Sequence, residues 1–399
     1  MPVLVAIFWI SAAIVAYTYV IYPLLMGFLA WIRPKAIRRT EGFRPHTTVL
    51  LAAFNEEATI GRRVSEFVRL LEHSKVTGEV MVVSDGSTDR TVSIVEAMVG
   101  GRRDSAVSVC LVELPVNRGK ALALTEGGKQ ARGEIIVLAD ARQTWAEDAI
   151  TKILENFADP DVGAVTGELM IESAPGVLAG IGLYWKFEKW LRLRESRVHS
   201  MVGVTGAVCA VRRDLFRPIP EGTITDDLYW PLLVAMQGRR VVFDPRAVAY
   251  DRLPDKVHDE FRRKVRTLCG NFQLIARLPG TVLPWRNPIW FAFISHKPLR
   301  LVVPWALIAM FFSSLAIGGA FYATLFTIQL IGYSIAVSGL YDPIGKKMRL
   351  AGTGASFLVL NAAAWMSFWV WISGNSSKSW RKVKYHTHAA TATVGPPGP

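Results

Sequence analysis

Three long blocks without a single charged residue dominate the hydrophobic pattern of the chain. They cover residues 1–32, 301–340 and 351–372. A helix needs about 20 apolar residues to cross a bilayer. The first and third blocks therefore each predict one span, and the second is long enough for two, with a turn near Gly318 and Gly319. We expect one transmembrane helix over residues 1–32 and about three over residues 299–373.

The flanks of these blocks predict an orientation. A cleaved signal peptide is the alternative for the first block, but no basic residue precedes it and it is too long for a signal core. The basic run Arg33–Arg39 follows at once, which places residues 33–298 in the cytoplasm by the positive-inside rule. Four crossings would leave the basic, partly disordered tail 374–399 outside. The alternatives are a tail on a membrane surface or a re-entrant block.

Between the blocks, short apolar runs alternate with helical stretches. This alternation predicts an α/β domain with a mainly parallel sheet, and interfacial helices toward residue 298. In such sheets, ligands bind beyond the carboxyl ends of the strands. Polar residues follow all four expected strands, which predicts a site at that edge. The strands are expected at 47–54, 79–85, 106–114 and 134–140. The helices are expected at 58–71, after the second strand as far as residue 98, and at 120–131.

Composition and charge narrow the class of protein. The chain is 51% hydrophobic and contains 13 Trp, which is too apolar for a plain soluble enzyme. Its net charge of +13 would suit nucleic acid. Much of that charge flanks the apolar blocks, however, where it meets anionic lipid. We expect membrane lipids and no nucleic acid as partners. The three cysteines lie far apart, without metal-ligand spacing, as in a reducing cytoplasm.

Two turns after strands contain candidate ligand contacts. Asp85 closes an apolar strand in SDGSTDRT, where its carboxylate can accept hydrogen bonds from a ribose or a base edge. Capping of the next helix is the alternative for this stretch. Lys120 opens a helix in NRGKALAL, and it faces either an anionic nucleotide group or solvent.

Three later stretches suggest further contacts. Small residues in TGAV would let a sugar ring approach the backbone, or would form a packed bend. Asp226 and Asp227 precede a helix, and one of them is expected to cap it. Adjacent carboxylates raise one another's pKa, and a carboxylate poised in this way can act as a general base. Helical spacing puts Arg263 and Arg266 on one face, where they suit a diphosphate or a membrane surface.

Taken together and in this order, these stretches resemble the membrane-bound glycosyltransferase family 2 enzymes, which include the bacterial cellulose, chitin-oligosaccharide, hyaluronan and poly-N-acetylglucosamine synthases. The resemblance covers roughly residues 47–273 and the flanking blocks. It implies the GT-A fold, a Rossmann-like domain that binds nucleotide sugars. It also implies an inverting transfer from a UDP-sugar, with Mg²⁺ or Mn²⁺ as cofactor.

The family motifs assign roles residue by residue. AAFNEE resembles the opening motif that holds uracil, which implies contacts by Phe54 and Glu56. Asp85 matches the retained acid of D-D-G-S-T-D, and Lys120 matches the lysine of the Gly-Lys step. The further assignments are Asp227 as catalytic base beside Asp226, Arg263 and Arg266 for the nucleotide sugar, and Asp140 for the nucleotide sugar and the metal; Thr205, Gly206 and Ala207 are expected to bind the acceptor.

Two departures from the family pattern bear on the mechanism. Thr267 replaces the Trp of Q-x-x-R-W, and Arg263 replaces its Gln. The missing Trp removes an aromatic platform for an acceptor sugar, which argues against long processive synthesis. Arg142 replaces the second acid of the D-x-D motif that starts at Asp140. Either Asp140 holds the metal with the diphosphate and water, or Arg142 takes over part of the metal's charge. We favour the first, because Mg²⁺ needs few protein carboxylates.

The resulting hypothesis is an inverting hexosyltransferase in the cytoplasmic membrane that acts in exopolysaccharide or cell-surface glycan synthesis. It would use a UDP-sugar donor and a glycan or lipid-linked acceptor. Four spans are few for a wide channel, so partner subunits of an export system are a further expectation. One alternative is a polyprenyl-phosphate sugar synthase, which the TDD and R-x-x-R motifs disfavour. The other is an inactive membrane assembly or sensor protein, which the retained Asp227 disfavours.

Overall fold

A mixed sheet of eight strands forms the centre of the molecule. The computed structural model describes residues 1–101, 105–172, 177–252, 257–341 and 347–374. Within these residues the strand order is β3-β2-β1-β4-β7-β6-β8-β5. The strands are β1 (Thr47–Ala53), β2 (Gly78–Asp85), β3 (Val107–Leu114), β4 (Ile135–Ala139), β5 (Thr144–Trp145), β6 (Val162–Glu172), β7 (Cys209–Arg212) and β8 (Arg240–Arg252).

The first four strands are parallel, as the alternation with helices predicts. β1 pairs with β2 and β4, and β2 pairs with β3, all in parallel. The crossover helices are α3 (Ile60–His73), α4 (Thr91–Gly100) and α5 (Lys120–Gln130). Alternate residues of β1 face opposite cores: Val49 packs with α3 and α6 (Ala149–Glu155), whereas Leu50 packs with α5 and α8 (Asp226–Met236). Both faces of the sheet are covered, which explains why these strands are almost uniformly apolar.

The second half of the sheet departs from the expected parallel arrangement. β7 is antiparallel to β4 and β6, and β5 is antiparallel to β8. β7 enters the sheet at the carboxyl end of β4, because Cys209, its first residue, pairs with Leu138. The loop before β7 is therefore placed at the same edge as the residues that follow β4. Only β6 and β8 pair in parallel here.

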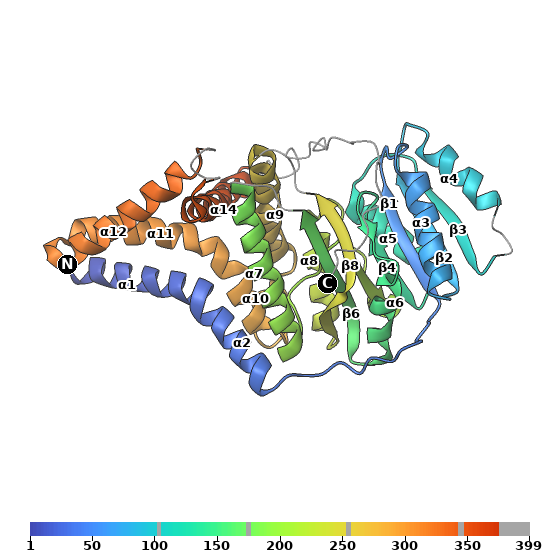
Figure 1. Ribbon diagram of the computed structural model, residues 1–399, viewed down its shortest axis with the longest axis horizontal. Helices are drawn as coiled ribbons and strands as arrows, with labels where there is room; N and C mark the ends of the chain where they lie inside the picture. The colour runs from blue at the N-terminus through green and yellow to red at the C-terminus, as the bar shows by residue number, and fades with distance from the viewer. Residues whose placement is uncertain (102–104, 173–176, 253–256, 342–346, 375–399) are drawn as a thin grey trace.

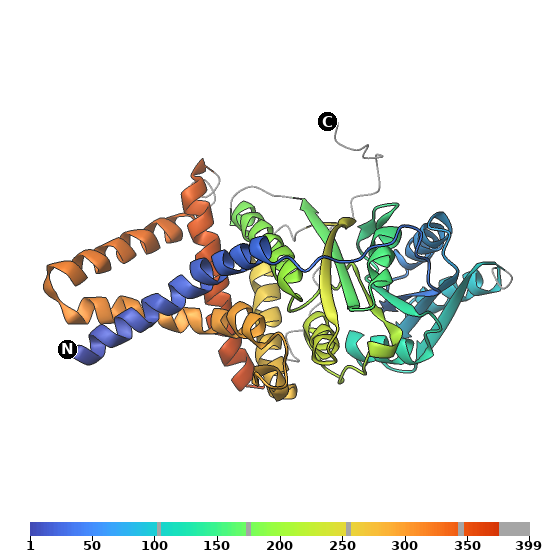
Figure 2. The ribbon, with the colours of Figure 1, turned by 90° about the horizontal axis from the view of Figure 1, so that it is seen from below.

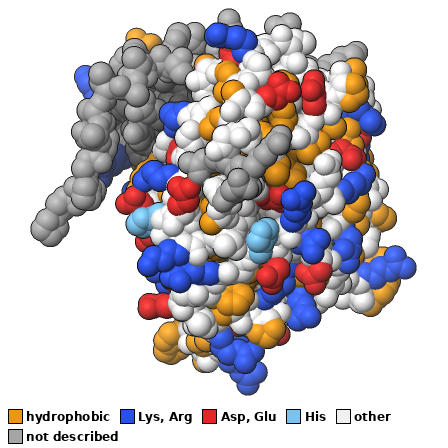
Figure 3. Space-filling view, turned by 90° about the vertical axis from the view of Figure 1, so that its right-hand side faces the viewer, with side chains coloured by type: hydrophobic (Ala, Val, Ile, Leu, Met, Phe, Trp, Pro, Cys, Tyr) orange, Lys and Arg blue, Asp and Glu red, His pale blue; other side chains and the backbone are white. Residues whose placement is uncertain are grey.

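The remaining helices of the domain connect and cover these strands. Three of them, α7, α9 and α10, form a layer between the sheet and the apolar helices (Figure 1). The surface at the opposite end of the molecule carries interspersed basic and acidic side chains (Figure 3), as expected of a water-facing domain. The bounds are α6 (Ala149–Glu155), η2 (Asn156–Ala158), α7 (Val177–Val198), η3 (Arg213–Leu215), α8 (Asp226–Met236), α9 (Val257–Arg277), η4 (Pro279–Val282) and α10 (Trp290–His296).

Within the part of the chain that the structure describes, four helical segments are long and apolar enough to cross a membrane. The predicted turn in the second block is present, at Gly318 and Gly319, both with positive φ. The expected tail lies outside the described residues from 375 onward. The four segments are Pro2–Ile32, which contains α1 (Pro2–Ala16), the π-helix η1 (Tyr17–Ile21) and α2 (Tyr22–Ile32); Trp290–Ile317, which contains α10 and α11 (Pro298–Ile317); α12 (Gly319–Ser338); and α14 (Arg349–Ile372).

The last of these segments, α14, has both ends on the side of the sheet domain. Its start packs on the end of α12, where a Cβ on Gly339 would meet the backbone of Ala351. Near its other end, Trp371 stacks on Phe272 of α9 with ring centroids 5.4 Å apart. In Figure 2, α14 runs across the direction shared by α1, α11 and α12. It therefore forms a floor between those helices and the layer of α7 and α9.

Candidate active site

A cavity of about 670 Å³ lies between the carboxyl edge of the sheet and the layer formed by α7, α9 and α14. It brings together residues from eleven separate stretches of the chain, including the apolar segment η1. Nine of the twelve residues that the sequence predicts for the site line this cavity. They are Lys120, Asp140, Thr205, Gly206, Ala207, Asp226, Asp227, Arg263 and Arg266.

Lys120 lies at the centre of a cluster of acids. Its Nζ is 2.7 Å from Asp140 Oδ1 and 3.7 Å from Asp226 Oδ2. Lys120 is the first residue of α5, Asp140 follows β4, and Asp226 is the first residue of α8. The ends of three elements therefore meet at one edge of the sheet. Burial disfavours the charge on Lys120, but the carboxylates of Asp140 and Asp226 outweigh it and raise the pKa of the lysine. Lys120 thus stays charged.

Asp227 has the properties of a general base. Burial and the neighbouring Asp226 carboxylate raise its pKa to about 6, against the opposing effect of Lys120 and Arg192. Arg266 lies close to the same two acids: burial lowers the pKa of its guanidinium, whereas both carboxylates raise it. A carboxylic acid with a pKa near neutrality is ionised at neutral pH, and its carboxylate can then accept a proton from a hydroxyl.

The expectation that one of these acids caps α8 is wrong. The N-cap residue is Thr225, and both acids lie in the first turn of the helix. The Thr225 hydroxyl donates to the Gly270 carbonyl oxygen of α9, at 3.3 Å. The capping position is therefore taken by a residue that fixes α8 to α9. Both carboxylates remain close to the positive end of the helix dipole.

The loop before β7 forms one wall of the site. A Cβ on Gly206 would lie 3.4 Å from Asp227 Cβ and 3.7 Å from Lys120 Nζ. The Thr205 hydroxyl accepts a hydrogen bond from Arg192 Nη1, at 3.0 Å, and the Ala207 carbonyl accepts one from Trp145 Nε1, at 3.1 Å. The backbone that faces the two acids is thus held in place by side chains from α7 and β5.

Arg263 and Arg266 both reach the cavity from α9, as their helical spacing predicts. Arg263 donates two hydrogen bonds to the buried Glu260 carboxylate, at 2.7 and 2.9 Å. This ion pair holds Arg263 in one position and offsets its charge. The carboxylates of Asp226 and Asp227 both act electrostatically on Arg266.

The three remaining predicted residues do not line this cavity. Asp85 accepts hydrogen bonds from the backbone N–H groups of Arg118, at 2.9 Å, and Gly119, at 2.7 Å. Its observed contacts therefore hold the turn that starts α5 and positions Lys120. Glu56 accepts a hydrogen bond from the Thr59 hydroxyl at 3.0 Å. Phe54 is 38% exposed at the end of β1, which leaves its ring accessible to a flat ligand.

The residues around Asp140 can be compared with the needs of a divalent metal. Among the described residues, no group of three or more His, Cys, Asp or Glu side chains is arranged to hold an ion. Asp140 is 35% exposed and lines the cavity, and Mg²⁺ is often held by one or two carboxylates together with substrate phosphates. The residues thus fit a metal that binds with its diphosphate. Arg142 pairs with Asp251 at 2.5 Å, and this carboxylate offsets its charge.

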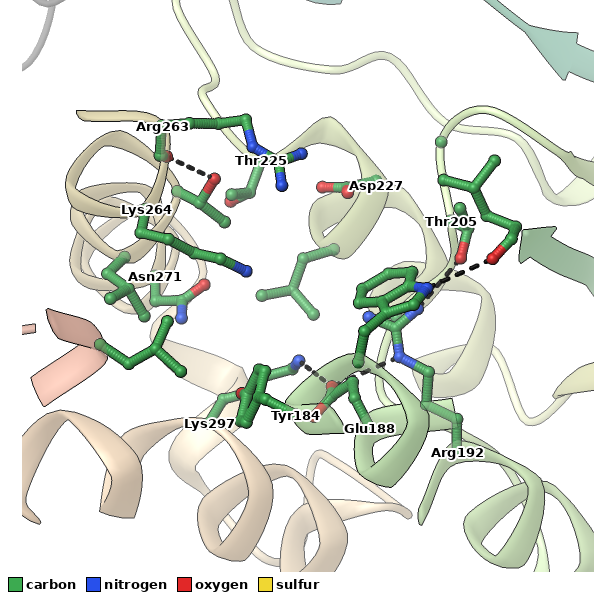
Figure 4. A pocket seen from close by; sticks show the side chains of 18 of the residues that line it. Tyr184, Glu188, Arg192, Thr205, Thr225, Asp227, Arg263, Lys264, Asn271 and Lys297 are labelled. Atoms are coloured by element: carbon green, nitrogen blue, oxygen red, sulfur yellow. Dashed lines mark hydrogen bonds and ion pairs between the residues drawn. The ribbon is translucent and has the colours of Figure 1, made fainter. Parts of the chain in front are cut away.

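Sequence analysis missed a second group of charged residues in the same cavity. Glu188 and Arg192 come from α7, Lys264 from α9, and Lys297 and Arg300 from the start of the α11 segment. Figure 4 shows Asp227, Lys264 and Lys297 extending into one space from different elements. The basic residues before the second apolar block are typical of membrane topology signals, so sequence pattern alone gave no reason to place them in a site.

Two family profiles match the chain. The profile of glycosyl transferase family 2 matches residues 48–219. The profile of glycosyl transferase family group 2 matches residues 135–336, which is just over half of the chain.

Curated relatives include two bacterial synthases. The chain is 25% identical over 282 residues to the poly-β-1,6-N-acetyl-D-glucosamine synthase of Staphylococcus epidermidis, and 25% identical over 283 residues to the enzyme of the same name from Staphylococcus aureus strain COL. Both matches cover 69% of this chain and 65% of the relative. The chain therefore spans about two thirds of the length of the curated relatives it matches.

A solved structure shares the whole architecture. It is a mannosyltransferase from Pyrobaculum calidifontis in complex with GDP-mannose and Mn²⁺, with a TM-score of 0.66 and 25% identity. The match covers 91% of this chain and 99% of the other. The predicted GT-A fold with flanking apolar helices is confirmed, and the four apolar segments mark the chain as a membrane protein.

Proposed function

The chain belongs to glycosyl transferase family group 2, and we propose that it transfers a sugar from a nucleoside diphosphate to the hydroxyl of an acceptor at a membrane. One observation carries the proposal: Asp227, Asp226, Lys120 and Arg266 meet at one end of a single cavity. Such a set supplies a base for the acceptor and cations for a diphosphate. The proposed role is in polysaccharide or cell-surface glycan synthesis.

The donor we propose is a UDP-sugar, as the family motifs imply. Phe54 lies at the end of β1 and Asp85 closes β2, so they are neighbours at the carboxyl edge of the sheet. This position suits a base and ribose beside the diphosphate end of the cavity. The similar mannosyltransferase was solved with GDP-mannose, so a GDP-sugar is the second donor to test.

In the proposed reaction, Asp227 removes a proton from the acceptor hydroxyl. The hydroxyl oxygen forms a bond to the anomeric carbon while the bond to the diphosphate oxygen breaks on the opposite face, which inverts the configuration. General-base help of this kind contributes a factor of roughly 10²–10⁴, or about 3–5 kcal/mol. Gly206 leaves space beside Asp227 for the acceptor sugar.

The leaving diphosphate gains negative charge, which nearby cations stabilise. Lys120 and Arg266 lie beside the acids and supply part of this charge. A Mg²⁺ or Mn²⁺ ion, when bound at Asp140 together with the diphosphate, would supply the rest. Arg142 contributes little in this proposal, since Asp251 already balances its charge.

The polyprenyl-phosphate sugar synthase alternative fits this site less well. A phosphate oxygen that attacks the donor is already ionised and needs no base, whereas the raised pKa of Asp227 equips it to take a proton. The inactive-sensor alternative leaves the same residue without a purpose. We therefore propose that the acceptor reacts through a hydroxyl, and that the catalytic domain lies on the cytoplasmic side, where nucleotide sugars are made.

Turnover of defined donors by the purified chain in detergent tests the proposal. UDP-glucose, UDP-N-acetylglucosamine, UDP-glucuronic acid and GDP-mannose would each be incubated with the protein and a membrane lipid extract, with and without EDTA. Release of UDP or GDP together with a glycosylated product from one donor supports the function. No turnover of any donor, by protein that binds the nucleotide, would contradict it and favour the sensor.

A further inference from the structure

The end of the cavity nearest the apolar helices contains an excess of positive charge. The Glu188 carboxylate has three basic neighbours: Arg192 at 3.3 Å, Lys297 at 3.5 Å and Arg300 at 2.7 Å. One carboxylate cannot balance three basic side chains, so these four residues together carry a net positive charge. The group, called here the cation group, lies in a place largely shielded from water, where an unbalanced charge is costly.

The nearby carboxylate of Glu195 offsets this excess only in part, because it acts electrostatically on Lys297 as one further carboxylate against three basic side chains. Its Oε1 accepts hydrogen bonds from the Tyr22 hydroxyl, at 2.6 Å, and contacts His296 Nδ1 at 2.7 Å. The other ring nitrogen of His296 contacts Glu188, at 2.8 Å. Glu195 is therefore engaged with Tyr22 and His296.

Arg300 has hydrogen-bonding capacity to spare. Its Nη1 donates to Glu188 and to the Tyr184 hydroxyl, both at 2.7 Å. Its Nε and Nη2 atoms are buried and have no hydrogen-bond partner among the described residues. Buried guanidinium N–H groups without an acceptor are rare and unfavourable. This arrangement suits an anion with several oxygen atoms.

Lys264 reaches the same space from α9. Its ammonium group lies 5.7 Å from the centre of the Tyr184 ring. Burial, reinforced by the Arg263 charge, lowers the pKa of Lys264 to about 8. Figure 4 shows Lys264 and Lys297 pointing into the cavity from different helices. An anion placed between them would stabilise both charged forms.

Apolar side chains from the membrane-side helices surround the cation group. They come from η1, α7 and α14, so this end of the cavity adjoins the apolar part of the molecule. Leu183 of α7 is 52% exposed beside it. A lipid tail could follow this wall. The apolar lining residues at this end are Tyr19, Leu183, Phe187, Phe357 and Leu360.

The cation group is close to the proposed base. Arg192 connects the two regions, because its Nε contacts Glu188 and its Nη1 donates to Thr205 of the acceptor wall. Arg192 and Lys297 also act electrostatically on Asp227. A headgroup bound at the cation group would therefore place what is attached to it near the base.

We propose that the cation group binds the phosphate or diphosphate of a lipid-anchored acceptor, whose sugar hydroxyl reaches Asp227. This inference rests on the proposed function and names the acceptor class for it. The acceptor phosphate is unchanged in the reaction: it anchors the substrate, and the proton passes from the sugar hydroxyl to Asp227. The lipid tail leaves along the apolar wall toward the membrane.

Direct binding to the full chain in detergent micelles tests the subsite without any turnover. Three probes separate the contributions: geranylgeranyl diphosphate has charge and tail, geranylgeraniol has the tail alone, and inorganic pyrophosphate has the charge alone. We expect the diphosphate lipid to bind at least about tenfold more tightly than either of the others, since charge-assisted hydrogen bonds and tail burial both contribute.

Lys297→Gln is the decisive variant, because its 3.5 Å contact to Glu188 is the longest in the cation group and its loss should spare the fold. It should weaken binding of the diphosphate lipid about tenfold. Lys264→Gln should act in the same direction. The matched control is Lys186→Gln, which removes an exposed cation of α7 that does not line the cavity. Thermal unfolding verifies that each variant is folded.

Five outcomes decide between these possibilities. Tighter binding of the diphosphate lipid that Lys297→Gln weakens and Lys186→Gln does not supports the subsite. Equal binding of geranylgeraniol and geranylgeranyl diphosphate would overturn it. Equal weakening of diphosphate-lipid binding by Lys297→Gln and by the control Lys186→Gln would overturn it as well. Pyrophosphate binding as tight as the lipid's would point to a free phosphate ligand and overturn the lipid assignment. Lipid binding without donor turnover would instead contradict the proposed function and leave the subsite standing.

Discussion

At the scale of single residues, the site depends on the different surroundings of two adjacent carboxylates, Asp226 and Asp227. Asp226 is held near the Lys120 ammonium, at 3.7 Å. Asp227, one residue later, has its pKa raised to about 6 by burial and by Asp226. Two adjacent carboxylates with different environments can take different roles. The first balances the charge of the lysine, and the second is left to move a proton.

This difference predicts a pH dependence. Asp227 is protonated below a pH of about 6 and ionised above it, so the transfer rate should rise with pH through that value and then level off. Asp226→Asn removes a negative neighbour, which lowers the pKa of Asp227 and should move this acidic limb to lower pH. Profiles of kcat/KM against pH for both proteins provide the measurement. An acidic limb that stays in place in the variant would contradict the assignment.

A second prediction concerns Arg142. Because Asp251 balances its charge, Arg142→Gln should retain transfer within about threefold and remain sensitive to EDTA. Asp140→Asn should lose about 10²-fold or more, since it removes a carboxylate that serves both Lys120 and a metal. Single-turnover rates with and without EDTA would compare the two. Loss in Arg142→Gln equal to that in Asp140→Asn would show that the arginine replaces the metal's charge.

At the scale of elements, two features place the acceptor wall and the base. β7 is antiparallel to β4, so the loop before β7 ends at the carboxyl edge of the sheet, near Asp140. α9 packs so closely on the start of α8 that a Cβ on Gly270 would lie 2.6 Å from Thr225 Cγ2 and 3.1 Å from Ile224 Cβ. The position of the first turn of α8, and with it Asp227, depends on this contact.

Gly270→Ala should therefore disturb the site from a distance. The added methyl group overpacks the contact, which costs about 1–3 kcal/mol, and should displace the start of α8 and reduce turnover. The control is Gly100→Ala at the end of α4, where no atom lies within 4 Å of the added Cβ. Thermal unfolding and turnover of both variants are the measurements. Equal behaviour of the two variants would refute the role of the α8–α9 contact.

Much of this arrangement could be predicted from the sequence. Asp85 is the last residue of β2, Lys120 comes after β3, and Asp140 comes directly after β4. Parallel strands bring their carboxyl ends to one edge of the sheet, so these residues could be expected to lie together. The antiparallel entry of β7 could not be predicted, because a four-residue strand after a long helix has no direction signal. The cation group was missed for a related reason: its members become a site only when α7 and the start of α11 pack together.

At the scale of the whole molecule, α14 decides the topology. The sequence left open whether the third apolar block crosses the membrane. α14 has the length and composition of a span, yet its start packs on the end of α12 and Trp371, near its other end, packs on α9. We therefore expect α1, α11 and α12 to cross the membrane and α14, which runs across their direction (Figure 2), to lie at its surface. Residues of α14 there line the cavity.

Cysteine labelling in intact cells tests this topology. In a chain whose three native cysteines are replaced by alanine, Gly318→Cys should react with a membrane-impermeant maleimide from outside. Lys347→Cys and Ser373→Cys, before and after α14, should react only after permeabilisation. Labelling of Ser373→Cys in intact cells would show that α14 crosses the membrane.

The central claim is that Asp227 is the base of a sugar transfer, and Asp227→Asn tests it most directly. The amide has nearly the same size but cannot take the proton. Transfer by the purified variant should fall at least about 10²-fold, while UDP or GDP binding, measured by titration calorimetry, stays within about twofold of the unaltered protein. Asp161→Asn, a change at a half-exposed acid paired with Lys35, is the control. Transfer by Asp227→Asn at the rate of the unaltered protein would contradict the account.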